Sequence, residues 1–110
     1  MNQPETHYTV ITSSGGFEEM PTLQEALART TAQNGYVWAD YVDPTAELLA
    51  ELMAAFGIHP LSIEDCLNGN QLPKLDLFPS YSFLIFNTFE ETPEELLSHE
   101  LDLFIGENFV

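Results

Sequence analysis

The chain has 110 residues, 45% of them hydrophobic, which is enough for one domain with a buried core. Two basic residues, Arg29 and Lys74, stand against 18 acidic ones and give a formal net charge of −16. This balance argues against nucleic acid and anionic lipid as partners, because both are bound through clusters of Lys and Arg. A surplus of carboxylates instead attracts cations, among which Mg²⁺ and Ca²⁺ prefer oxygen ligands. The plainer interpretation is an acidic, well-solvated surface.

Cysteine content and targeting signals narrow the setting. The single Cys66 can form no internal disulfide, so a reducing compartment is compatible. Residues 1–7 lack the basic start and the apolar stretch of a signal peptide. The longest aliphatic and aromatic run, residues 83–86, is far shorter than the ~20 residues that cross a bilayer. We therefore expect a soluble chain.

Strand and helix signals alternate in the first part of the chain. Alternating side chains predict a strand over residues 6–12. Thr22 and Glu25 form a capping box that opens a helix, and Asn34-Gly35 closes it. An aromatic-rich strand is expected over residues 36–41, directly after this helix.

Two further helices are predicted in the middle of the chain. Asp43 as the cap and Pro44 in the first turn indicate a helix that ends at Gly57. Pro60 opens a shorter helix that runs to about Leu67, because proline is tolerated in a first turn.

The last third is typical of strands. Residues 68–70 form a turn by composition, and residues 81–89 read as a strand buried on both faces. An acidic loop is expected over residues 90–95, followed by an alternating strand over 101–105. The apolar residues 109–110 enter a strand that stops at once, which is typical of a fragment cut from a longer protein.

The order of elements predicts an α+β fold, an α/β/α-type sandwich with a mixed, mostly antiparallel sheet flanked by helices. Residues 1–110 are expected to form a single domain. The residues expected in the core are Trp38, Leu48, Leu52, Phe56, Phe83 and Ile85.

The sequence shows few groups of residues that could act together in catalysis. The chain has no glycine-rich phosphate loop, and its three histidines show no metal-ligand spacing. Neighbouring Glu64 and Asp65 should raise the pKa of the Cys66 thiol, which predicts an inert cysteine. A small hydrolase using Glu64 or His59 would lack a nucleophile and an orienting partner, so we expect no enzyme.

The pair Glu64-Asp65 is the strongest candidate for a binding function. It lies on the short helix whose Ile63 and Leu67 should face the core. A rotation of ~100° per residue places Asp65 roughly opposite Ile63, pointing away from the core. One or two carboxylates with retained water are enough to bind Mg²⁺, although an ordinary solvated helix face explains the same pattern.

A set of short strings is distinctive when taken together. These are Val37-Trp38-Ala39-Asp40, Phe56-Gly57-Ile58-His59-Pro60-Leu61, Ile63-Glu64-Asp65, Leu67-Asn68, Gln71, Pro73-Lys74, Tyr81 with Phe83, and Leu101-Asp102-Leu103-Phe104-Ile105-Gly106-Glu107-Asn108-Phe109. Together they resemble the cytosolic amino-terminal domain of the CorA-type magnesium and cobalt transporters. Leu72 stands where that family commonly has an arginine. The family's Gly-Met-Asn pore signature, its membrane helices and its stalk helix are not in these 110 residues.

The resemblance implies a cytosolic regulatory domain that helps to gate divalent cation transport. Asp65, with Glu64 beside it, matches the acid that binds a regulatory Mg²⁺ or Co²⁺ between neighbouring subunits of a homopentamer. The partner acid in such transporters lies on the stalk helix of the adjacent subunit. The implied location is the cytoplasmic face of the cell membrane, with the membrane reached only through a carboxy-terminal part beyond this sequence.

A second function from another class fits the same charge. A stand-alone acidic interaction module of this fold would bind a basic protein partner. The two hypotheses differ in whether a stalk and membrane helices follow Val110. Neither gives the chain a catalytic or organic-cofactor site.

Overall fold

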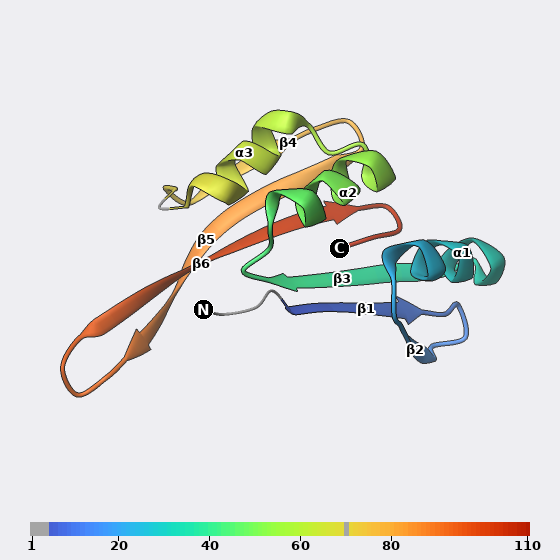
Figure 1. Ribbon diagram of the computed structural model, residues 1–110, viewed down its shortest axis with the longest axis horizontal. Coiled ribbons are helices and arrows are strands. Elements are labelled where there is room, and N and C mark those ends of the chain that lie inside the picture. Colours follow the sequence, from blue (N-terminus) through green and yellow to red (C-terminus); the bar gives the residue numbers. More distant parts are fainter. Residues whose placement is uncertain (1–4, 70) are drawn as a thin grey trace. The chain divides into compact units, whose positions relative to one another are not determined.

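A computed structural model of the chain describes residues 5–69 and 71–110 (Figure 1). In chain order the elements are β1 (Glu5–Ile11), β2 (Phe17–Met20), α1 (Leu23–Gln33), β3 (Tyr36–Val42), α2 (Ala46–Phe56), α3 (Pro60–Asn68), β4 (Lys74–Leu77), β5 (Tyr81–Glu91) and β6 (Leu96–Gly106). They form two compact units. The first runs up to Thr45 and takes in Gly106–Val110, and the second is Ala46–Ile105.

The first unit is a three-stranded sheet with one helix packed on it. Its strands are antiparallel in the order β2-β1-β3, and α1 contacts all three. Val10 and Val37 face each other in the ladder and are almost fully buried. The guanidinium of Arg29 on α1 forms a two-bond ion pair with Glu18 on β2, with Nε···Oε2 at 2.6 Å and Nη2···Oε1 at 2.9 Å. This pair ties the helix to the sheet edge.

The last residues of the chain add a parallel bridge to β3. Phe109 lies opposite Val37, and the Ala39 N–H donates to the Val110 carbonyl at 2.8 Å. Gly106 permits this return, because a Cβ built there would lie 2.1 Å from the Phe109 ring. The apolar residues 109–110 are therefore part of the first unit, and Phe109 is buried.

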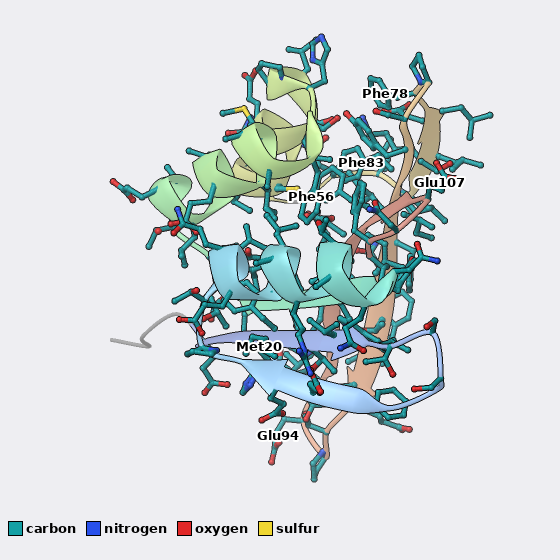
Figure 2. All side chains as sticks on the ribbon, turned by 90° about the vertical axis from the view of Figure 1, so that its right-hand side faces the viewer. Met20, Phe56, Phe78, Phe83, Glu94 and Glu107 are labelled. Atoms are coloured by element: carbon teal, nitrogen blue, oxygen red, sulfur yellow. The ribbon has the colours of Figure 1, made fainter. Side chains whose placement is uncertain are left out.

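The second unit is built on the sheet β4-β5-β6. Asp76 pairs with Phe83 in the antiparallel β4–β5 ladder. Phe83 is fully buried, and its ring stacks on that of Phe104 with centroids 4.5 Å apart. The helices α2 and α3 contact each other, and each has buried residues, among them Leu52 and Ile63. Figure 2 shows the Phe83 side chain within this unit.

The strands β5 and β6 form a long hairpin of eleven residues on each side. Its turn is closed by the Thr92 N–H, which donates to the Glu95 carbonyl at 2.9 Å. The far half of the hairpin extends past α3 and β4 (Figure 1), and Glu94 lies at its tip (Figure 2).

The α+β class predicted from the sequence is confirmed, and so are the three helices and four of the strands. The strands form two three-stranded sheets where the sequence predicted one mixed sheet. The prediction that residues 1–110 form one domain stays a prediction. The turn predicted over residues 68–70 includes Asn70, which lies outside the described residues.

Several local predictions were wrong for identifiable reasons. Asp43 does not cap α2, because it takes a left-handed conformation with φ of 51° and the helix begins at Ala46. Trp38 is not in the core: it lies on the face of β3 opposite to buried Val37 and is 53% exposed. Glu90 belongs to β5 rather than to a loop, and its carboxylate pairs with His99 on β6 at 3.1 Å.

Candidate functional site

The candidate acids lie on α3, whose start is fixed by three hydrogen bonds. The imidazole Nδ1 of His59 accepts the Leu61 N–H at 3.0 Å and so caps the helix. The His59 N–H donates to the hydroxyl of Tyr81 on β5 at 2.9 Å, and the same hydroxyl lies 3.0 Å from Ser62 Oγ. Because Tyr81 is buried, these bonds hold the first turn of α3 against the second sheet.

We expect His59→Ala to lower the free energy of unfolding by about 1 kcal/mol, the usual value of a capping side chain. His59→Asn should retain most of it, because an amide oxygen can accept the same N–H. Urea unfolding followed by circular dichroism measures both. Equal losses in the two variants would contradict the capping role and assign the loss to the stacking of His59 on Phe78.

Asp65 is ion-paired rather than free. The Lys74 ammonium on β4 lies 2.5 Å from Asp65 Oδ2 and 2.9 Å from Asp76 Oδ2. The pKa of Lys74 is raised by the hydrogen bond to Asp65 first and by that to Asp76 second. The Asp65 side chain is 26% exposed. The sequence predicted that Asp65 points away from the core but gave no partner for it, and in the structure that partner is Lys74 on β4.

Glu64 takes a different position from its neighbour. It is exposed on α3, one residue and ~100° away from Asp65 around the helix. The structure therefore places the two candidate acids in different surroundings, with Asp65 facing β4 and Glu64 facing solvent.

A second pair of carboxylates, Glu100 and Asp102, lies on β6. Glu100 and Asp102 are two residues apart on β6, where side chains share a face, and the Gln71 N–H donates to Glu100 Oε1 at 2.9 Å. Asp102 Oδ1 is buried, and among the described residues it has no hydrogen-bond partner. Burial first, and then the hydrogen bond and charge of Glu100, raise the pKa of Asp102 to about 7.

Cys66 adjoins this group and is chemically quiet. Burial raises the pKa of its thiol, and the negative charge of Asp102 raises it further. A protonated thiol is neither a nucleophile nor a metal ligand, so the predicted inert cysteine agrees with its surroundings. The main causes are burial and Asp102, however, and not the neighbours Glu64 and Asp65.

The described part of the chain, the surroundings of Asp65 included, offers no complete metal centre. Within residues 5–69 and 71–110 there is no group of three or more His, Cys, Asp and Glu side chains that could hold a metal ion. Over the same residues no helix is both long and apolar enough to pass through a membrane.

The position of the Lys74 ammonium indicates that the site can bind a positive charge. Oxygen atoms from α3 and β4 converge on one cationic nitrogen, so the geometry already accepts a positive charge between Asp65 and Asp76. Two carboxylates supplemented by water suit Mg²⁺, which binds few protein ligands and keeps much of its hydration shell. The two carboxylates present therefore suit a hydrated divalent cation.

The comparison with known proteins identifies the family. A sequence model described as CorA-like Mg2+ transporter protein matches residues 33–110, which is more than half of the chain. The chain belongs to this family, as the resemblance of its strings predicted. The matched region contains Glu64, Asp65, Lys74 and Asp76. Its members are ion transporters and not enzymes.

Individual relatives come from bacteria and yeast. The putative metal ion transporter YfjQ of Bacillus subtilis is 39% identical over 75 residues, which are 68% of this chain and 23% of the relative. The cobalt/magnesium transport protein CorA of Thermotoga maritima is 40% identical over 50% of this chain and 16% of its own length. The magnesium transporter ALR1 of Saccharomyces cerevisiae is 42% identical over 52% of this chain and 7% of its own length. The chain thus spans less than a quarter of these relatives.

Proposed function

We propose that this chain is the cytosolic amino-terminal regulatory part of a CorA-like transporter of Mg²⁺ or Co²⁺, and that Asp65 binds the regulatory cation at an interface between subunits. The observation that carries the proposal is that Asp65 and Asp76 converge on one positively charged group, the Lys74 ammonium. The family match over residues 33–110 supports the transport context.

The mechanism follows from charge. Subunits with a formal net charge of −16 repel one another when they are brought together in a homo-oligomer, which we propose to be a pentamer. A divalent cation held by Asp65 and by an acid of the neighbouring subunit offsets that repulsion and favours the closed assembly. The ion shifts the gating equilibrium only by its difference in affinity between the closed and open states. A fall in cytosolic Mg²⁺ would then favour opening.

Each acid has its own part in this scheme. Asp65 supplies the direct oxygen ligand, because it lies on α3, whose first turn is fixed by His59 and Tyr81. Glu64 is exposed beside it and adds negative charge or accepts a hydrogen bond from a metal-bound water. The remaining ligands are water and the acid of the partner subunit. The whole would act at the cytoplasmic face of the membrane.

The first test is Mg²⁺ binding to the 110-residue chain, followed by amide chemical shifts. We expect saturable shifts centred on α3 and β4, and at least tenfold weaker binding in Asp65→Asn, because one direct ligand is lost. Glu47→Gln is the matched control: it removes one negative charge from an exposed position on α2 and should leave the affinity within twofold.

Two outcomes would overturn the assignment. Shifts spread evenly over all acidic residues would show a diffuse counterion atmosphere. Equal effects of Asp65→Asn and Glu47→Gln would show that net charge, not Asp65, governs binding. In the complete transporter, Asp65→Asn should also make closure less sensitive to Mg²⁺. Without any localised response, the acidic interaction module with a basic protein partner becomes the better hypothesis.

A further inference from the structure

The Lys74 ammonium contacts Asp65 Oδ2, an oxygen of the residue that we propose as the cation ligand. Lys74 is one of only two basic residues in the chain, against 18 acidic ones. Its ammonium contacts Oδ2 of Asp65 and Oδ2 of Asp76, from a helix and a strand that are separate in the sequence. The other basic residue, Arg29, pairs with Glu18 in the first unit and takes no part here.

We propose that Lys74 is a built-in competitor of the regulatory cation: its ammonium holds Asp65 when the ion is absent and is displaced from Asp65 when the ion binds. This inference rests on the proposed function and adds a residue that sets the cation concentration at which the site responds.

Competition follows from the geometry. Mg²⁺ binds carboxylate oxygen at about 2.0–2.1 Å. The ammonium lies 2.5 Å from the same Asp65 oxygen, so a directly bound ion would lie against it. Two cations at such a distance repel strongly in a partly buried site. An ion on Oδ2 therefore requires the ammonium to withdraw, and an ion on Oδ1 is opposed by the positive charge of the ammonium.

The Lys74 ammonium can move to another position when it is displaced from Asp65. The lysine side chain is 34% exposed, and its flexible stem lets the ammonium move toward solvent. Asp76, at 2.9 Å, is a second acceptor on its own strand, and the Phe83 ring lies with its centroid 5.6 Å from Nζ. A shift of the ammonium toward Asp76 would free Asp65 without leaving the lysine unpaired.

Displacement also has a structural consequence. The Lys74–Asp65 ion pair links α3 to β4. When the cation replaces the ammonium, that link is broken while the start of α3 stays fixed by His59 and Tyr81. Cation binding is thus expected to loosen β4 from α3, which amide shifts of β4 would report.

The test compares two variants that remove one positive charge each. Lys74→Met should raise the affinity of the 110-residue chain for Mg²⁺ by about threefold to tenfold, because the competing ammonium is gone. Arg29→Met is the matched control with the same change in net charge, and it should alter the affinity less than twofold. In the unaltered chain the ¹³Cε and Nζ signals of Lys74 should move with the same midpoint as the Mg²⁺ titration.

The outcomes separate this inference from the proposed function. If Asp65→Asn weakens Mg²⁺ binding but Lys74→Met leaves it unchanged or weaker, competition is wrong and the cation site stands. Equal gains in Lys74→Met and Arg29→Met would assign the effect to net charge and also overturn the competition. If the chain shows no Mg²⁺ response at α3, the proposed function itself fails. Lys74→Gln, which keeps a polar side chain, serves if Lys74→Met unfolds.

Discussion

Replacing Phe83 by alanine is expected to lower the free energy of unfolding by about 4 kcal/mol, because deletion of a buried aromatic ring leaves a cavity. Phe83 has no exposed surface and stacks on Phe104 with an interplanar angle of 8°. Phe83 also pairs with Asp76 in the β4–β5 ladder. The buried residue of β5 therefore lies next to the strand that carries Lys74 and Asp76. Urea unfolding followed by circular dichroism measures the loss.

Phe89→Ala provides the matched control on the same strand. Its side chain is 66% exposed on the extended part of the hairpin, and its removal should cost less than about 1 kcal/mol. Phe83→Leu should recover much of the lost stability, because it refills part of the cavity. Similar losses for Phe83→Ala and Phe89→Ala would contradict the assignment of the core to the inner face of β5.

Local chemistry explains what could be predicted from the sequence. The start of α1 at Thr22 is a capping interaction between near neighbours, with the Glu25 N–H donating to Thr22 Oγ1 at 3.1 Å. Its end at Asn34, which has φ of 51°, is likewise local. The start of α3 at Pro60 follows from a property of proline itself. Such features need no knowledge of distant residues.

Features that depend on distant residues were missed. The strands β2 and β4 have four residues each, too few for an alternating pattern to stand out, and their ladders with β1 and β5 define them. The sequence placed Asp65 on α3 correctly but gave no partner for it. The available signal was Lys74 itself, because a rare lysine in so acidic a chain is expected to pair with a carboxylate.

Trp38 shows a different limit. Its bulk predicted burial, yet strand periodicity already placed it on the face opposite to Val37. The alternation of side chains along β3, and not the size of the tryptophan, determines which residue is buried. Val37 pairs with Val10 in the β1–β3 ladder and is buried. For the candidate site, therefore, the sequence and the family resemblance supplied Glu64 and Asp65, whereas Lys74, Asp76 and the group around Asp102 required the structure.

A second large effect is expected from pH, through Asp102. Its pKa is raised to about 7 in the folded chain, whereas an aspartate in an unfolded chain titrates near 4. The folded state thus binds a proton that the unfolded state has lost, so the stabilisation is complete below about pH 4 and is lost as the pH rises through 7. Between pH 5 and pH 8 we expect the free energy of unfolding to fall by about 1–2 kcal/mol, a figure reduced for partial solvation of the side chain.

Asp102→Asn isolates this effect from the other titrating groups. The variant cannot ionise, so its stability should change less with pH, and at pH 8 it should be the more stable by about 1–2 kcal/mol. The same histidines and the same other carboxylates are present in both proteins, so the difference between their pH profiles reports Asp102. Asp40→Asn, at an exposed position on β3, removes the same charge and should keep the slope of the unaltered chain. An undiminished slope in Asp102→Asn would contradict the assignment of this proton to Asp102.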